Sequence, residues 1–160
     1  MDTPQKLATR LRTEGDRFAR FFSSLDQEQW GSDIYTEGSV WTIRNVLSHF
    51  VTSERGFLKL FEDIRQGGNG VSEDFSIDRF NASQQLKMEA KSPDELLVEF
   101  RDVRNKMCQW VEALSEHDLE RSGRHPYLGR VSLLEMIKMV YLHNQIHLRD
   151  IRKVILEDSG

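Results

Sequence analysis

Apolar residues recur every three or four positions along most of this chain, a spacing typical of helices that bury one face. The pattern predicts four long helices, at about residues 4–25, 42–65, 93–114 and 133–156. The last two have clear start signals, because Ser92 and Ser132 are each followed three residues later by a glutamate that can complete a capping box. Four long amphipathic helices predict an all-α fold, a four-helix bundle.

The connections between these helices differ in length. Residues 67–91 form a long crossover between the second and third helices, and within it residues 78–90 are expected to form a short extra helix. Residues 31–40 and 121–131 are expected to be irregular, although the latter segment can also form a small hairpin around Gly129. The sequence has no repeat and no strand-like alternation, so we expect a single bundle domain over residues 1–160.

Composition narrows the class of protein. Hydrophobic residues make up 38% of the chain and charged residues 30%, which is typical of a soluble globular domain. No apolar run approaches the ~20 residues that span a bilayer, and the N-terminus lacks the order of a signal peptide, so we expect a cytoplasmic protein. The single cysteine, Cys108, excludes an internal disulfide. A net charge of −4 without a basic stripe argues against nucleic acid and against a membrane surface as partners.

Two histidines lie in the apolar stripe of the fourth helix. On a helical wheel, His143 and His147 fall within about 60° of Met136, in the middle of the face that must meet the core. Burying two imidazoles costs free energy unless each ring is hydrogen-bonded or ligated. Residues four apart place both rings on one face, which is the spacing with which a helix chelates a metal ion. A pair of hydrogen-bonded core residues, or a rotated helix that leaves both rings in water, explains the same spacing.

A third histidine strengthens the metal interpretation. His49 lies on the second helix at the edge of its apolar stripe, on a flank that it shares with Ser53, and from there it can meet a pair at the centre of a neighbouring helix. Asp150 follows His147 by three residues and can either orient a ligand histidine or form a surface ion pair. Asn81 can face the site from the crossover or simply cap a turn.

The other chemically interesting residues are expected outside the site. Glu54 lies well away from His49 on the helical wheel and is not proposed as a base. Cys108 is expected to be a small apolar residue, and His117 and His125 are expected to be exposed loop residues. The three tryptophans are expected to be packing residues: Trp30, Trp41 and Trp110.

The motifs carry a family resemblance over nearly the whole chain. WTIRNVLSHF at residues 41–50 and HNQIH at residues 143–147 resemble the DinB-like superfamily, specifically its YfiT-like metal-binding members. IDRFNA at residues 77–82 is similar to the crossover of that family, and SPDELL at residues 92–97 is similar to the start of its third helix. No motif is specific alone; their order and spacing carry the resemblance.

The resemblance implies a bundle with a three-histidine metal site, and the ligands map to His49, His143 and His147. It also implies zinc or nickel as the metal and a homodimer as the assembly. Members of the family include transferases that depend on bacillithiol or mycothiol, a maleylpyruvate isomerase and proteins regarded as metal-dependent hydrolases. Members without the three histidines exist as well, so the fold alone does not imply metal.

These expectations lead to two classes of function. The first is an enzyme that acts on a small-molecule substrate, either by transfer to or from a low-molecular-weight thiol or by hydrolysis. Three imidazoles leave at least one coordination position of the metal for water or a thiol, and a dication lowers the pKa of that ligand. The alternative is a protein without turnover, which either binds and sequesters a small molecule or serves as a structural bundle under stress.

Overall fold

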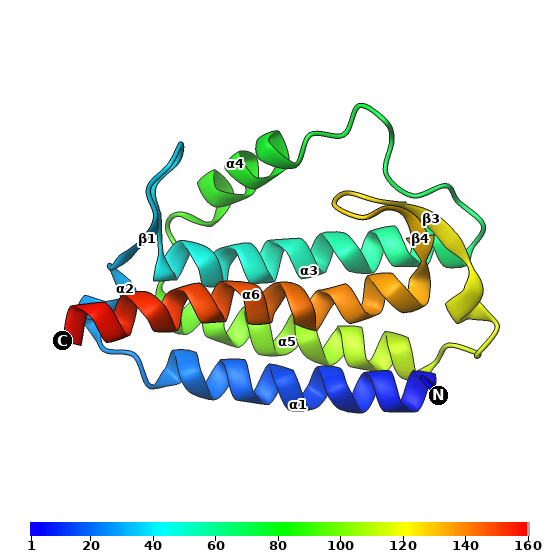
Figure 1. The fold of residues 1–160 in the computed structure, drawn as a ribbon, viewed down its shortest axis with the longest axis horizontal. Coiled ribbons are helices and arrows are strands. Elements are labelled where there is room, and N and C mark those ends of the chain that lie inside the picture. The colour runs from blue at the N-terminus through cyan, green and yellow to red at the C-terminus, as the bar shows by residue number, and fades with distance from the viewer. Residues whose placement is uncertain (160) are drawn as a thin grey trace.

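The computed structural model describes residues 1–159, and its four long helices form the predicted four-helix bundle (Figure 1). These helices are α1 (Pro4–Ser23), α3 (Ile43–Arg65), α5 (Pro93–Glu112) and α6 (Leu133–Ser159). Helices α1 and α6 run in one direction and α3 and α5 in the other (Figure 1). Both α1 and α3 contact α5 and α6. The two helices with the candidate histidines, α3 and α6, are therefore antiparallel neighbours.

The helix starts are set by side-chain caps. The Thr3 hydroxyl accepts a hydrogen bond from the Lys6 N–H, and Pro4 occupies the first turn, where its missing N–H costs nothing. Thr42 and Ser92 each form a complete capping box. Ser132 accepts a hydrogen bond from the Glu135 backbone, which confirms the predicted start of α6.

The core contains the predicted apolar stripes and divides into two adjoining clusters. One cluster gathers around Phe61, Met107 and Met136, and the other around Phe22, Phe50 and Phe100. The apolar residues that recur along α5 and just beyond it are all buried: Leu96, Phe100, Val103, Met107, Val111 and Leu114. Burial of each such side chain contributes about 1.5–3 kcal/mol, so the bundle is held mainly by these stripes.

Short elements decorate the bundle. A four-residue helix, α2 (Gln27–Trp30), precedes strand β1 (Asp33–Tyr35), which pairs antiparallel with β2 (Trp41–Thr42). The expectation of irregular chain at residues 31–40 is therefore wrong in part, because Tyr35 pairs with Trp41 across this ribbon. A 3-10 turn, η1 (Asp118–Glu120), leads into the hairpin of β3 (Ser122–His125) and β4 (Gly129–Ser132). That hairpin confirms the alternative for residues 121–131, with Gly129 at a positive φ of 72°.

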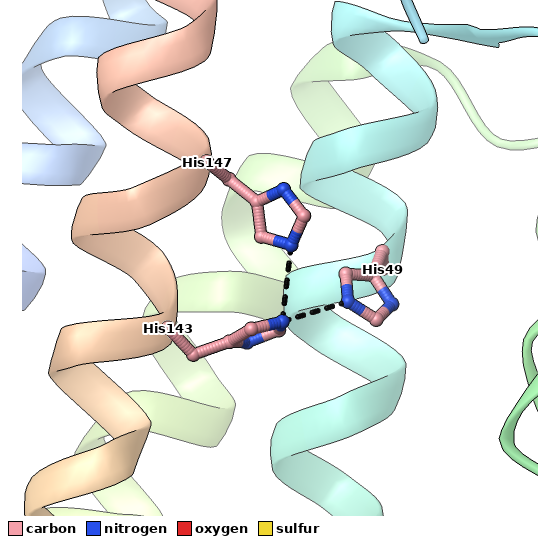
Figure 2. Close-up of side chains that lie close together, drawn as sticks. All are labelled: His49, His143 and His147. Carbon is pink, nitrogen blue, oxygen red and sulfur yellow. Dashed lines mark hydrogen bonds between the residues drawn. The ribbon is translucent and has the colours of Figure 1, made fainter. Parts of the chain in front are cut away.

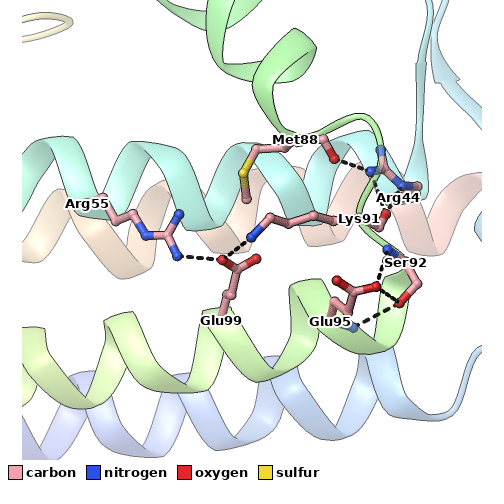
Figure 3. A network of polar contacts seen from close by, with 7 residues as sticks. All are labelled: Arg44, Arg55, Met88, Lys91, Ser92, Glu95 and Glu99. Carbon is pink, nitrogen blue, oxygen red and sulfur yellow. Dashed lines mark hydrogen bonds and ion pairs between the residues drawn. The ribbon is translucent and has the colours of Figure 1, made fainter.

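The crossover helix α4 (Ile77–Met88) lies over the outer side of α3 (Figure 1). Its C-terminal end is fastened to α3, since the Arg44 guanidinium donates to the backbone carbonyls of Met88 and Lys91 (Figure 3). Gln85 exchanges hydrogen bonds with Asn45 one turn earlier on α4. These contacts hold α4 in place above the part of α3 that carries His49.

A second set of polar contacts fastens the start of α5. Glu99 accepts hydrogen bonds from both Arg55 on α3 and Lys91 in the connecting loop (Figure 3). The Ser92–Glu95 capping box lies beside them.

No helix among residues 1–159 is long and apolar enough to cross a membrane.

Candidate metal centre

Three imidazole rings converge between α3 and α6 (Figure 2). His49 comes from α3, and His143 and His147 come from successive turns of α6. The Nε2 atom of His143 lies 3.1 Å from that of His49 and 3.0 Å from that of His147. One ring nitrogen of each histidine lies within 4.8 Å of the others. The structure therefore brings together the three residues that the sequence pointed to.

Helix geometry explains the convergence. His143 and His147 lie on the same side of α6, four residues apart, and α6 packs that side against α3. His49 is 3% exposed and lies close to the start of α3. Its ring centroid lies 4.9 Å from that of His143 and 5.3 Å from that of His147. A residue at the edge of one stripe thus meets a pair at the centre of the other, as the helical wheels predict.

Burial keeps all three rings neutral. It lowers the pKa of His49 well below its ordinary value of 6.5, and the two neighbouring histidines lower it further. Burial also lowers the pKa of His143 to about 3 and that of His147 to about 4. Neutral imidazole is the form that ligates a metal ion, so the site is in its ligating state at neutral pH.

Hydrogen bonds on the far side of two rings bear on which nitrogen is free. The Tyr35 hydroxyl donates to the Asp150 carboxylate over 2.6 Å and lies 2.7 Å from Nδ1 of His147. Because the hydroxyl proton points to Asp150, the Tyr35 oxygen accepts a hydrogen bond from the Nδ1–H group of His147, which leaves a lone pair on Nε2. Ser53 Oγ lies 3.1 Å from Nδ1 of His49 and can accept a hydrogen bond from it in the same way. Ligand histidines in metal sites are held by such outer hydrogen bonds.

The convergence is poorly satisfied by hydrogen bonds alone. A ring nitrogen carries either one proton or one lone pair, so Nε2 of His143 forms at most one full hydrogen bond with the two nitrogens beside it. Two imidazoles bound to one tetrahedral zinc ion hold their nitrogens roughly 3.3 Å apart. The observed separations of 3.0 and 3.1 Å are close to that spacing. The residues present thus fit a metal ion.

Aromatic rings surround the triad. The Trp41 ring centroid lies 5.0 Å from that of His49, and the Phe50 centroid lies 5.7 Å from that of His147. Tyr127 stacks on His143 with an interplanar angle of 29°. Trp41, expected as a packing residue, therefore also borders the site. Tyr35 and Tyr127 come from segments expected to be irregular, so sequence patterns gave no signal for them.

Several residues lie where the sequence predicts them. His117 is exposed, and Cys108 is a buried apolar-like residue whose pKa burial raises to about 11. Trp30 stacks on Phe22, and Trp110 donates to Glu62 on α3. The hydrogen bonds from Asp150 to His147 run through the Tyr35 hydroxyl, which the helix spacing could not reveal because Tyr35 is distant in sequence.

The prediction for His125 is wrong. It was expected to be an exposed loop residue, but it ends strand β3, is 2% exposed and stacks on Phe57 at 5.3 Å. Its Nδ1 accepts hydrogen bonds from the backbone N–H groups of Tyr127 and Leu128, so it organises the hairpin turn. Asn81 lies beside the same turn and hydrogen-bonds Tyr127, and so reaches the surroundings of the triad. Glu54 does not face the triad; it is buried in an ion pair with Arg104.

Solved structures with the same fold include proteins with metal- or thiol-related descriptions. YfiT from Bacillus subtilis, described as a probable metal-dependent hydrolase with an unusual four-helix bundle topology, matches with a TM-score of 0.79 and 16% identity over 98% of this chain and 87% of its own. The mycothiol-dependent maleylpyruvate isomerase matches with a TM-score of 0.74 and 18% identity over 94% of this chain. This chain spans only 63% of that isomerase.

A third match is the colibactin self-resistance protein ClbS, whose structure was determined in complex with double-stranded DNA. It has a TM-score of 0.73 and 11% identity over 100% of this chain and 98% of its own. At these identities the likeness shows the fold. No curated protein matches this sequence. The sequence profile of the DinB superfamily matches residues 10–151, which is most of the chain. The chain belongs to the DinB superfamily.

Proposed function

We propose that His49, His143 and His147 bind one divalent metal ion and that the protein uses it as an enzyme acting on a small molecule. One observation carries the proposal: ring nitrogens of three neutral histidines converge, and the Tyr35–Asp150 pair holds the His147 ring with its converging nitrogen free. Zinc and nickel are the ions we favour, because imidazole nitrogen suits both.

The arrangement supports a site with an open coordination position. Among the described residues, the cluster of possible ligands contains His49, His143 and His147 and no fourth histidine, cysteine or carboxylate. A divalent ion in such a site supplies Lewis-acid chemistry and makes hydroxide or thiolate available near neutral pH. Tyr35 and Asp150 hold the proton on Nδ1 of His147, so that Nε2 would be free to bind the ion.

The reaction that we propose is transfer to or from a low-molecular-weight thiol, or hydrolysis. A relative described as a probable metal-dependent hydrolase supports the second, and one described as mycothiol-dependent supports the first. The aromatic side chains around the triad, Trp41, Phe50 and Tyr127, give it apolar surroundings, which favour a small organic molecule as the substrate.

Metal analysis tests the first half of the proposal. Protein purified without a metal-affinity column should contain, or take up from micromolar solution, about one zinc, nickel or cobalt ion per chain. His147→Ala should abolish uptake and leave the helical content unchanged, while His117→Ala, at an exposed position outside the site, should retain full uptake. Wild-type protein that takes up no divalent ion would overturn the proposal.

Turnover tests the second half. The metal-loaded protein should either conjugate bacillithiol, mycothiol or a simple analogue to an electrophile, or cleave an ester or amide without thiol. Either activity should disappear in His49→Ala, and excess metal should not restore it. A protein that binds metal but shows no metal-dependent turnover in either assay is a binding or sequestration protein instead.

We also propose a homodimer. The family resemblance implies one, but the aromatic first helix offers little surface for it, because Phe18 and Phe22 are fully buried in the core. Support comes instead from α6, where Leu142 and Ile146 lie four residues apart and are 43% and 44% exposed. Sedimentation at tens of micromolar should give a dimer that Ile146→Glu converts to monomer; a wild-type monomer would contradict the proposal.

A further inference from the structure

An apolar cavity of about 120 Å³ lies between α3, α4 and the turn of the β3–β4 hairpin. Its lining includes Gly56 and Phe57 of α3, Val71 and Phe75 of the loop before α4, Phe80 and Asn81 of α4, and Tyr127 of the hairpin turn. Figure 1 shows that α4 and the hairpin both lie over α3, so segments distant in sequence line this space together. Apart from the amide of Asn81 and two hydroxyls, the side chains that line it are apolar.

Two of the lining residues touch the histidine triad. Ser53, whose Oγ lies 3.1 Å from Nδ1 of His49, lines the cavity. Tyr127 lines it as well, and its ring centroid lies 5.8 Å from that of His143. The cavity is therefore separated from two of the three candidate ligands by single side chains. A molecule that enters it lies one side chain away from His49 and from His143.

The size and the chemistry of the cavity define what it can hold. A volume of about 120 Å³ is close to the ~150 Å³ of apolar cavities that admit a benzene ring. No charged side chain lines it among the described residues, so a charged group would lose its hydration without gaining a partner. An uncharged group of about one ring would instead bury its surface against Phe57 and Phe80.

We propose that this cavity is the substrate subsite for an uncharged, ring-sized apolar group, and that Gly56 determines the size of the group that it accepts. The proposal rests on the proposed function, because it assigns to the substrate of the metal site an apolar portion about the size of a phenyl ring. The hydroxyls of Ser53 and Tyr127 and the amide of Asn81 are the polar groups of the cavity lining, and Ser53 and Tyr127 also contact the triad.

Gly56 offers a discriminating variant. A Cβ atom added there would lie 3.4 Å from Cζ of Phe80, which is ordinary contact, so alanine fits without displacing α4. Alanine stabilises a helix relative to glycine by roughly 0.5–1 kcal/mol, while its methyl group removes space from the cavity. Gly56→Ala should therefore bind ring-shaped ligands more weakly and melt at a higher temperature. A variant that was merely damaged would bind the ligand more weakly and would also melt at a lower temperature.

The first experiment needs no metal. Fluorobenzene titrated into the metal-free protein and followed by ¹⁹F NMR should bind saturably, more weakly in Gly56→Ala, and undetectably in Gly56→Val. Lys59→Ala is the matched control, because Lys59 is exposed on the same helix and does not line the cavity; it should bind as the wild type does. Absence of binding, or equal binding by Gly56→Val, would overturn the proposal.

The second experiment connects the cavity to the metal site. Benzohydroxamate and acetohydroxamate bind metal ions through the same two oxygens and differ by a phenyl ring in place of a methyl group. Titrated into cobalt-substituted protein and followed by its visible spectrum, benzohydroxamate should bind about tenfold or more tightly than acetohydroxamate. Gly56→Val should remove that preference and leave the affinity for acetohydroxamate unchanged.

The two proposals fail in different ways. If the protein takes up no cobalt, the metal proposal fails, and the fluorobenzene titration still decides whether the cavity binds a ring. If cobalt binds and both hydroxamates bind equally well, the metal proposal stands and the subsite proposal is overturned.

Discussion

Two buried polar clusters lie next to each other between α3 and α6, and they are built on opposite principles. One is the histidine triad. The other centres on Arg104 of α5, which reaches Glu54 of α3 and Asn144 of α6. The two clusters use adjacent residues on both helices. On α6, Asn144 follows His143, and on α3, Glu54 follows Ser53, which contacts His49.

The Arg104 cluster is complete. Its guanidinium donates to both carboxylate oxygens of Glu54 over 2.8 Å, and it also donates to Asn144 and to the backbone carbonyl of Leu11. Each of its three side-chain nitrogens therefore has a partner, and its positive charge is balanced by one carboxylate. The side chain even fills the space of a missing Cβ at Gly15, where an added atom would lie 2.7 Å from its Cγ.

The histidine triad is incomplete by the same standards. It contains three neutral rings and no charge, and its central nitrogen has two neighbours but at most one full hydrogen bond. A buried polar cluster that satisfies itself holds helices together, whereas one that lacks a cation has the composition of a binding site. The comparison therefore indicates a structural role for Arg104 and supports the metal-binding role that we propose for the histidines.

Arg104→Met should have the largest effect on stability. The change leaves Glu54 buried without its partner, so we expect the free energy of unfolding to fall by about 3–5 kcal/mol. Denaturant titration of the metal-free protein measures the loss. Arg101→Met, at an exposed position on the same helix, is the control and should change stability little. If both variants were equally stable, the Arg104 cluster would not be structural.

Acidification should expose the cost of burying neutral histidines. Between the lowered pKa of about 3 for folded His143 and the ordinary value of 6.5 in the unfolded chain, only the unfolded chain binds the proton. The stability that depends on neutral His143 is thus complete above pH 6.5 and declines as the pH falls towards 3. In metal-free protein, His143→Leu should reduce the loss of unfolding free energy between pH 7 and pH 5 by about 2 kcal/mol.

The measurement is urea unfolding at several pH values. His117→Ala removes a histidine from the surface and should leave the pH dependence of the wild type intact. A His143→Leu protein that lost as much stability as the wild type over this range would show that His143 takes up its proton in the folded state, contrary to the burial seen here.

Tyr35→Phe should have the smallest effect on stability and a selective effect on metal. The change removes the hydroxyl that accepts a hydrogen bond from Nδ1–H of His147. Loss of such a hydrogen-bond partner of a ligand histidine typically lowers metal affinity about 10–100-fold. Competition with a chromophoric chelator measures the affinity. Tyr141→Phe is the control, because Tyr141 packs beside Arg10 of α1 rather than against the triad. Equal metal affinity in the two variants would remove Tyr35 from the site.

The helices and the triad could be predicted because local spacing encodes them. Positions 143 and 147 share a helix face whatever the tertiary structure, and serine–glutamate caps mark helix starts by themselves. Which helices become neighbours is not local, but a buried histidine on each of two helices leaves few alternatives.

The remaining features depend on contacts between distant segments. Tyr35 reaches His147 only because a three-residue strand folds back beside α6, and such a short strand has no periodicity to detect. His125 was misplaced for the same reason: a histidine before a proline is typical of an exposed loop, and only the packing of the hairpin on Phe57 buries it. Arg104 and Glu54 lie on different helices, and a helical wheel of one helix does not show which residue of another helix it will meet.

The crossover gives this fold a replaceable part. The residues of α4 that anchor it to α3, Gln85 and Met88, are in its second half, whereas Phe80 and Asn81, which face the cavity, are in its first half. Substitutions near Phe80 can therefore reshape the space beside the triad while the anchors and the bundle core remain as they are. With the subsite that we propose, selection in nature or in the laboratory would change what the site accepts by altering one short helix, with the histidines unchanged.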